Sequence, residues 1–294
     1  MSEFINAAVS GILIGLLYAM IAMGFVVIYR ASKIFNFAQG ELLVLAGFFI
    51  WSLARQVGLA VPISVMLGIV GVAVVGFVIE RVFFSRLVGE SPFSMVMVTL
   101  ALLILIRGII LVAWGPDVRA FPAVFALKPI VIGDILISRA LLYGGFISIA
   151  CALGLSWFFG NTRLGLALTA VSEDHQVALS LGISVRKAMT IAWVMGSVLS
   201  AIASVVYLSG RSLNFLVSDI AFAALPVALL AGLESVGGLI PAGILVGLTQ
   251  VLAQSYLNPL VGADIASVVP YLVILLVLFA RPTGLFGWKR IERV

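Results

Sequence analysis

A cluster of polar residues interrupts the apolar N-terminal part of the chain at residues 32–41, Ser-Lys-Ile-Phe-Asn-Phe-Ala-Gln-Gly-Glu. Backbone that leaves a helix at membrane depth needs protein groups or a water-filled cavity to satisfy its amides and carbonyls. Carboxylates and amides near the membrane are costly, so they tend to face an interior or a solute pathway. We therefore predict a broken-helix element along a translocation route, in which Gly40 allows the chain to bend. The predicted pathway residues are Asn36, Phe37, Gln39, Gly40 and Glu41.

The alternative for this segment is an ordinary turn at the membrane surface. In that case Asn36 caps a helix, and Lys33 and Glu41 are solvated. The residue pattern alone is compatible with either arrangement.

The loop at residues 161–186 is the second candidate for a functional segment. Ser172 to Ser180 is predicted to form a short amphipathic helix, and Gly182 can end it in a left-handed cap. A small residue, Ala178, would permit close docking. A short helix held outside the membrane suits a docking knob for a cytosolic partner, and the alternative is a helix lying on the membrane surface.

Charged residues inside apolar stretches form the third feature. Glu80 and Arg81 lie near the end of such a stretch, where their side chains can reach the interface. Arg107 precedes Trp114 by seven residues, about 10 Å inside the predicted boundary at 1.5 Å per residue. It either pairs inside the bundle or bends up to the interface, and a structural role is favoured over a role in substrate binding.

Several kinds of chemistry are excluded by residues that the chain lacks. There is one histidine, His175, and one cysteine, Cys151, so neither a His-based nor a Cys-based metal site is expected. No Gly-x-x-x-x-Gly-Lys-Ser/Thr loop is present, so we expect no ATP site in this chain. No constellation of nucleophile, base and metal ligands suggests an enzyme, and no cofactor is expected.

Composition places the chain in a membrane. Of its 294 residues, 63% are hydrophobic and only 10% are charged, whereas a soluble domain carries about 25% charged residues. The net charge of +5 is assigned to loops that face anionic lipid headgroups, not to nucleic-acid binding. Glycine pairs such as Gly11/Gly15 and Gly243/Gly247 indicate close helix packing.

The predicted fold is all-α, a single polytopic membrane domain over residues 1–294 with about nine spans; eight or ten are also compatible with the pattern. A span needs about 20 mostly apolar residues. Two longer loops, 115–137 and 161–186, separate spans. The predicted spans are 4–29, 40–58, 61–85, 92–114, 138–160, 187–209, 217–235, 238–256 and 264–281.

The distribution of lysine and arginine predicts the orientation, because these residues concentrate in cytoplasmic loops. With the N-terminus outside, eleven fall on the cytosolic side and five outside, and Arg107 lies within a span. This places 161–186 in the cytosol and 115–137 outside, the latter as a compact lid. The cytosolic set is Arg30, Lys33, Arg81, Arg86, Arg163, Arg186, Lys187, Arg281, Lys289, Arg290 and Arg293, and the outer set is Arg55, Arg119, Lys128, Arg139 and Arg211.

Several motifs, in this order along nearly the whole chain, resemble permeases of branched-chain amino acid (LIV-type) ABC transporters. They are Gly15-Leu-Leu-Tyr-Ala-Met-Ile-Ala-Met-Gly24, Asn36-Phe-Ala-Gln-Gly-Glu41, the run from Arg163-Leu-Gly-Leu through Ala178 and Gly182, and Arg281-Pro-Thr-Gly-Leu-Phe-Gly287. The resemblance implies the ABC importer permease fold and a location in the bacterial inner membrane.

The resemblance also implies partners: a homologous second permease, two cytosolic ATPase subunits that bind the ATP, and a periplasmic substrate-binding protein. The loop 161–186 would be the coupling element, with Glu173, Asp174, Ala178 and Gly182 in contact with the ATPase. Where the family commonly has histidine, this chain has Gln39, which puts a proton-linked role at this position in doubt.

We therefore expect the chain to form one half of the membrane pathway of an ABC importer that works by alternating access. The implied solutes are branched-chain amino acids or related small polar molecules such as urea, amides or aromatic acids. The rival is a stand-alone secondary carrier or channel, which ATPase co-purification would distinguish. Substrate identity is expected to depend largely on the binding protein.

Overall fold

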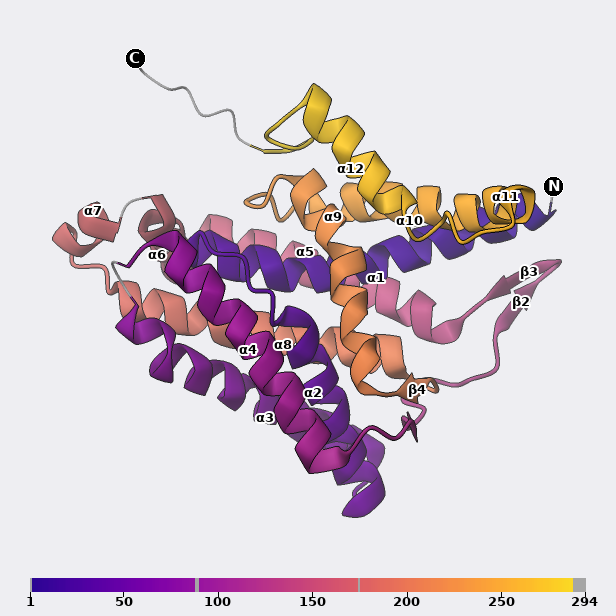
Figure 1. The fold of residues 1–294 in the computed structure, drawn as a ribbon, viewed down its shortest axis with the longest axis horizontal. Coiled ribbons are helices and arrows are strands. Elements are labelled where there is room, and N and C mark those ends of the chain that lie inside the picture. Colours follow the sequence, from indigo (N-terminus) through magenta and orange to yellow (C-terminus); the bar gives the residue numbers. More distant parts are fainter. Residues whose placement is uncertain (1, 88–89, 174, 288–294) are drawn as a thin grey trace.

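The computed structural model describes residues 2–87, 90–173 and 175–287, and it is a bundle of helices with very little strand (Figure 1). The chain follows α1 (Ser2–Ser32), α2 (Gln39–Trp51) with a π-helical turn η1 (Ser52–Gln56), α3 (Val61–Val82) with a 3₁₀ turn η2 (Phe84–Arg86), α4 (Pro92–Trp114), β1 (Arg119–Ala120), β2 (Ile130–Ile132), β3 (Ile135–Ile137), α5 (Arg139–Asn161), α6 (Arg163–Glu173), α7 (His175–Ser180), α8 (Val185–Leu208), β4 (Ser212–Leu213), a 3₁₀ turn η3 (Phe215–Asp219), α9 (Ile220–Ala231), α10 (Leu239–Leu252) with a π-helical turn η4 (Ala253–Leu257), α11 (Asn258–Val261) and α12 (Val269–Ala280).

Every predicted span coincides with helix, but the helices differ in length. Within the described residues, six helical segments are long and apolar enough to cross a membrane. The other three predicted spans, 40–58, 217–235 and 264–281, correspond to the shorter α2, α9 and α12. The fold is therefore all-α and polytopic, and a count of nine full spans is not confirmed.

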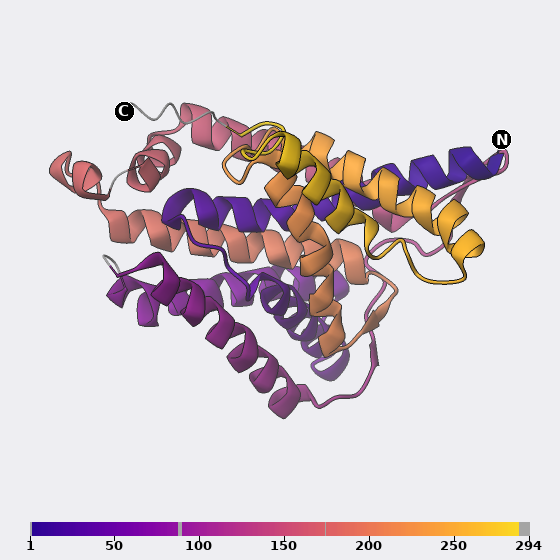
Figure 2. The same ribbon diagram turned by 45° about the horizontal axis from the view of Figure 1, so that its top comes forward.

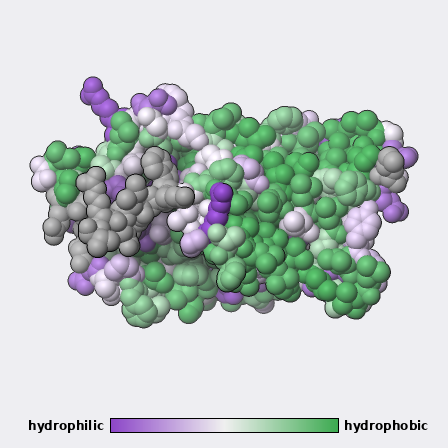
Figure 3. Space-filling model, turned by 90° about the horizontal axis from the view of Figure 1, so that it is seen from above, coloured by the Kyte–Doolittle hydropathy of each residue, from purple (hydrophilic) through white to green (hydrophobic). Residues whose placement is uncertain are grey.

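The bundle has two distinct ends. The hairpin end carries the N-terminus, the β2–β3 hairpin and the β1–β4 pair, and Asn6 of α1 donates to the carbonyl of Asp134 beside the hairpin at 2.8 Å. The α6–α7 end lies at the opposite side (Figures 1 and 2). The two long loops, 115–137 and 161–186, thus lie at opposite ends of the bundle, as predicted. In the face seen in Figure 3, most hydrophilic residues lie toward these two ends and apolar side chains cover the surface between them.

The helices form two repeats of opposite direction. The first comprises α1, α2, α3 and α4, and the second comprises α8, α9, α10 and α12. The most extensive helix contacts occur in matching pairs: α1 packs on α10 as α3 packs on α8, and α1 contacts α9 as α2 contacts α8. The starts of α3 and α10, residues 61 and 239, are 178 positions apart. Because α1 runs toward the α6–α7 end and α8 runs away from it, the repeats are inverted.

Glycine allows the closest helix packing, between α1 and α10. A Cβ at Gly15 would collide with the backbone of Gly243, and one at Gly247 would collide with the backbones of Gly11 and Gly15. The close packing predicted for these glycines is confirmed, and the two pairs prove to pack against each other. Without a hydrophobic force between helices in lipid, such backbone contact is a main source of association.

We expect Gly15→Ala to lower the thermal unfolding temperature of the detergent-solubilised protein, because its methyl group has no room and overpacking costs about 1–3 kcal/mol. Gly154→Ala is the matched control in helix α5, since nothing lies within 4 Å of its Cβ position. There alanine should be neutral or stabilise the helix by about 0.5–1 kcal/mol. Tryptophan fluorescence during heating measures both. Equal unfolding temperatures in the two variants would contradict the glycine-mediated contact.

Candidate functional site

The polar segment after α1 is a true break in the helix. Lys33 has a positive φ of 55° and ends α1, and residues 34–36 are irregular. The Oδ1 of Asn36 accepts from the backbone N–H of Ala38 at 3.1 Å and closes a local turn. The carbonyl of Phe35 accepts from Thr99 of α4 at 3.1 Å. Polar groups of this chain therefore satisfy backbone that has left the helix, as the broken-helix prediction requires.

Gln39 fixes the start of α2 in the interior of the bundle. Its Nε2 donates to the carbonyl of Gly196 at 3.1 Å and to Oγ of Ser200 at 2.6 Å, both near the middle of α8. Its Oε1 accepts from Nδ2 of Asn36 at 3.1 Å. Gly24 of α1 makes room for this side chain, since a Cβ there would collide with Nε2. Gln39 is 0% exposed, so its amide ties the break to both long central helices.

Glu41 forms the charged part of the same site. It is 1% exposed, and its Oε1 accepts from Arg107 of α4, with distances of 2.8 Å to Nε and 2.6 Å to Nη2. Nη2 of Arg107 also donates to Oγ of Ser218 at 2.7 Å and lies 3.7 Å from Oδ1 of Asp219. Arg107 thus pairs inside the bundle, and it joins α2 to the η3–α9 segment.

The second break, before α9, mirrors the first and was missed by the sequence analysis. Asn214-Phe215-Leu-Val-Ser218-Asp219 has the same pattern as Asn36-Phe37-Ala-Gln-Gly40-Glu41, with asparagine, phenylalanine, a small residue and an acid at equal spacing. The two motifs touch, because a Cβ at Gly40 would collide with the carbonyl of Ser218. A search for an internal repeat with an offset of 178 residues would have detected this second half of the site.

The predicted pathway residues do gather at one place. They form a packed contact, here called the joint, between the start of α2, Arg107 of α4 and the η3–α9 segment. Asn36, Gln39, Gly40 and Glu41 are all buried, which rules out the alternative of a solvated surface turn. Phe37 is half-buried, with its ring centroid 5.8 Å from that of Phe35. Gly40 lies in the first turn of α2, so it provides close approach to Ser218 in place of the expected bend.

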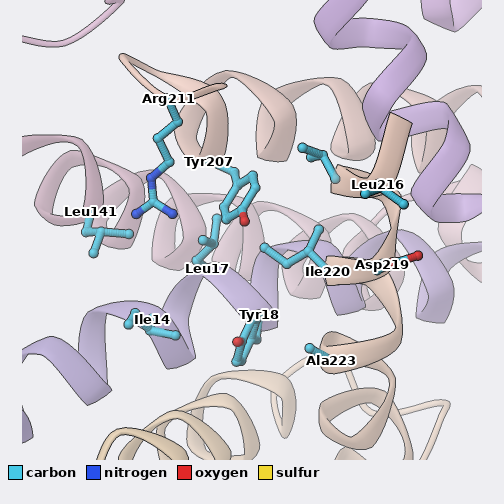
Figure 4. A pocket seen from close by; sticks show the side chains of 11 residues that line it. Ile14, Leu17, Tyr18, Leu141, Tyr207, Arg211, Leu216, Asp219, Ile220 and Ala223 are labelled. Carbon is cyan, nitrogen blue, oxygen red and sulfur yellow. The ribbon is translucent and has the colours of Figure 1, made fainter. Parts of the chain in front are cut away.

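Two cavities flank this joint, and neither is lined by the five predicted pathway residues. The outer cavity, toward the hairpin end, has a volume of about 340 Å³ and lies among α1, α8 and the η3–α9 segment (Figure 4). The inner cavity, toward the α6–α7 end, measures about 710 Å³ and lies among α1, α6 and the loops around Gly232 and Thr283. Asp219, which lies 3.7 Å from Arg107, lines the outer cavity, and Arg30 of the last turn of α1 lines the inner one.

Helix α6 connects directly to the end of α1. Nη2 of Arg30 donates to Oγ1 of Thr169 at 3.1 Å, and its guanidinium lies 4.1 Å from the ring centroid of Phe159. The Nζ of Lys33 forms an ion pair with Glu234, after α9, and lies 4.0 Å from Glu173 of α6. A displacement of α6 would thus act on the residue at which the break begins.

The coupling segment differs from its prediction in detail. It contains two helices, α6 and α7, where one helix over 172–180 was expected. Glu173 is exposed at the end of α6, whereas Asp174 lies outside the described residues. Gly182 has φ +76°, which confirms the predicted left-handed cap after α7.

Ala178 is only 1% exposed, because its methyl group packs inside this chain. Its small size is thus required by the fold of the loop itself. The exposed large apolar residues in and directly after α7 are Val177, Leu179 and Leu181, and α6 exposes Leu164 and Leu166. The amphipathic pattern was interpreted without the packing of α7 on α6 and α8, which decides its buried side.

Comparison with known proteins identifies the chain's relatives. Residues 7–278 match the family described as the permease component of the branched-chain amino acid transport system. The high-affinity branched-chain amino acid transport system permease protein BraD of Pseudomonas aeruginosa is 26% identical, over 99% of this chain and 98% of that protein. LivH of Escherichia coli, of the same description, matches with the same identity and coverage. A probable branched-chain amino acid transport permease protein LivH of Methanocaldococcus jannaschii is 22% identical, over 95% of this chain and 91% of that protein.

We expect Glu41 and Arg107 to be energetically coupled. Glu41→Gln or Arg107→Gln should each destabilise the protein by about 1–3 kcal/mol, because the remaining partner loses its counter-ion and hydrogen bonds. The double variant should lose at least about 1 kcal/mol less than the sum of the two. Unfolding in a denaturing detergent titration measures the cycle.

Arg86→Gln and Asp117→Asn form the control cycle, since both residues are exposed and lie at opposite ends of the bundle. Their effects should simply add. An additive result for Glu41 and Arg107 as well would show that the ion pair does not hold the joint.

Proposed function

The chain belongs to the family of branched-chain amino acid transport system permease components, and from this premise we propose that it is a membrane permease subunit of an ABC importer for branched-chain amino acids. The observation that supports this most strongly is the family match over residues 7–278, together with a multi-pass helical fold. The names of the relatives support the solute class, with related small polar solutes as the wider range.

The proposal includes the rest of the transporter. A second, homologous permease would complete the pathway, two cytosolic ATPase subunits would bind and hydrolyse ATP, and a periplasmic binding protein would deliver the solute. This chain would hold no cofactor. The hairpin end would face the periplasm and the α6–α7 end the cytosol of a bacterial inner membrane, in agreement with the excess of basic residues at the latter.

Coupling would start at α7. Val177 and Leu179 of α7, and Leu181 directly after it, present exposed apolar side chains at the α6–α7 end, the last of them 70% exposed. This exposed apolar surface could bind in a groove of an ATPase subunit, because exposed apolar patches rimmed by polar residues mark interaction sites. Asp174, for which a contact with the ATPase is also proposed, immediately precedes this helix in the sequence.

A movement of the ATPase subunits would then be transmitted from α7 through α6 to the joint. Its residues Thr169 and Glu173 contact Arg30 and Lys33, and the break that begins at Lys33 leads to Gln39 and Glu41. We place the hinge of alternating access at this joint, since it lies between the outer and inner cavities and is held by hydrogen bonds and ion pairs that can be exchanged. Packed polar joints of this kind switch between discrete arrangements and do not deform continuously.

Reconstitution tests the proposed function. Proteoliposomes that contain the permease with its co-purifying subunits should accumulate radiolabelled leucine, isoleucine or valine only when ATP is inside and the binding protein outside. Omission of either component should abolish uptake. Uptake that needs neither would support the rival function, a stand-alone carrier.

The coupling role of α7 is tested by Leu181→Asp. A carboxylate on the apolar knob should reduce ATPase capture and ATP-driven uptake at least tenfold, because burying an unpaired charge in an interface is costly. Leu136→Asp is the matched control, an exposed leucine of the hairpin at the other end of the molecule. Both proteins should insert and fold normally. Normal uptake by the Leu181→Asp protein would exclude this surface as the docking site.

A further inference from the structure

One wall of the inner cavity is held by an ion pair between the ends of α1 and α9. Lys33 directly follows α1, and its Nζ pairs with Oε1 of Glu234, in the loop after α9. Their side chains are 22% and 31% exposed, so water and salt screen the pair only in part. Glu234 lines the cavity, as does Arg30, one turn before Lys33. The pair therefore joins the two elements that form this wall.

A second carboxylate lies close to the same lysine. Oε1 of Glu173, at the end of α6, is 4.0 Å from Nζ of Lys33, at the limit of an ion pair, and its side chain is 64% exposed. Glu173 also lines the inner cavity. In the part of the chain that the structure describes, Glu234 and Glu173 are the only carboxylates within 4.0 Å of this ammonium group. Lys33 thus lies between an acid beside α9 and an acid on the coupling helix α6.

The backbone on both sides of the pair has an unfavourable conformation. Among the described residues, Lys33 and Leu233 are the only two non-glycine residues with a positive φ, 55° and 38°. Lys33 is one partner of the pair, and Leu233 immediately precedes the other. Glycine is the usual residue at the left-handed end of a helix, because a Cβ is disfavoured there. Strain of this kind persists only where surrounding contacts hold it, and it gathers in segments that switch.

The loop after α9 is held in place by the closing motif of the sequence, residues 281–287. The backbone N–H of Leu285 donates to the carbonyl of Leu230 at 2.7 Å. A Cβ at Gly232 would collide with the backbone of Gly287, so the two segments are in direct contact. The acid of the pair is therefore fixed in position. The lysine, whose ammonium group sits on a flexible four-carbon stem, is the partner that can move.

We propose that Lys33 is the moving part of an inner latch on the cytosolic side of the permease. Paired with Glu234, it closes the wall of the inner cavity between α1 and α9. Transferred to Glu173, it frees the loop after α9 and opens this wall, so that the solute leaves the cavity. The latch rests on the proposed function, because release of a solute presupposes its import, and it adds the residues that control this step.

The transfer avoids an unpaired charge, because one carboxylate replaces another beside the same ammonium group. Loss of the only partner of a partly buried charge would be costly. A movement of α6 toward the end of α1 shortens the 4.0 Å separation between Glu173 and Lys33, so the coupling helices drive the exchange. The left-handed backbone at Lys33 relaxes when the pair with Glu234 opens. Two alternative pairings of one side chain give the discrete states that a switch needs.

The test measures the accessibility of the inner cavity in the purified importer complex in lipid nanodiscs. Ser172→Cys is the reporter, since Ser172 lines the cavity and is only 7% exposed, and Cys151 is replaced by alanine. Glu234→Gln should speed alkylation of this cysteine by a bulky maleimide about tenfold, because the latch has lost its closed pairing. Glu173→Gln should not speed alkylation, because Lys33 then keeps Glu234 as its only acid. Both variants should lower ATP-driven uptake.

Substitutions of Lys33 separate its charge from its backbone. Glycine adopts the left-handed conformation without strain, so Lys33→Gly protein should fold as stably as the unaltered protein and be alkylated as fast as Glu234→Gln protein. The charge exchange, Lys33→Glu with Glu234→Lys, should restore slow alkylation. It should not restore uptake, because the new acid faces Glu173 and cannot be transferred to it.

Lys187→Gln is the matched control. Lys187 is an exposed lysine of α8 at the same end of the bundle, and it forms no ion pair within the residues that the structure describes. Its variant should be alkylated at the rate of the unaltered protein. Unfolding temperatures identify any variant that fails to fold.

Equal alkylation rates in folded Glu234→Gln and Glu173→Gln proteins would overturn the latch, because an ion pair that only stabilises the fold responds alike to the loss of either acid. Alkylation needs no transport, so this outcome is distinct from a failure of the proposed function. If the unaltered importer takes up leucine while the two rates are equal, only the latch fails. If the unaltered importer takes up no branched-chain amino acid, the proposed function fails instead.

Discussion

A chain that leaves its helix inside a bilayer must find partners for its free amides and carbonyls within the protein. This requirement governs the centre of the molecule. Asn36 closes the turn at the first break, and Gln39 carries the start of α2 onto Gly196 and Ser200 of α8. Gly24 has no side chain, which leaves space for the side chain of Gln39. Helices α1 and α8 therefore approach each other closely at Gly24 and Gly196. The arrangement of the central helices thus follows from the need to satisfy one irregular segment.

The inverted repeat produces this situation twice and lets the two breaks support each other. Helices α2 and α9 both begin in the interior and run to opposite ends, and their starting residues touch at Gly40 and Ser218. Arg107 joins the acidic residues of the two breaks. Discontinuous helices that meet at the interface of inverted repeats commonly surround the solute sites of transporters. The same meeting point here lies between the two cavities.

Contacts at the α6–α7 end connect this centre to the part of the chain proposed to meet an ATPase. Arg30 lies in the last turn of α1 and contacts α6. Lys33 directly follows α1 and contacts both α6 and the loop after α9. Helix α1 packs closely on α10 at Gly11 and Gly15 and on α8 at Gly24, and closely packed helices transmit a displacement because protein interiors are hardly compressible. The break, α1, α8 and α6 are therefore connected by direct contacts.

The sequence by itself determined the apolar segments, the close packing of the glycine pairs, the position of the first break and the presence of helix in the loop at 161–186. These properties depend on residues near one another in the chain, such as a run of about 20 apolar residues or a glycine that can end a helix. Only the tertiary structure decided that α2, α9 and α12 are short, that Arg107 pairs with Glu41, that Asn214 to Asp219 form the second break, that Ala178 faces inward, and that Lys33 lies between Glu234 and Glu173. Each of these depends on side chains from segments far apart in the sequence, or on which face of a helix is covered, and local periodicity carries no information about either.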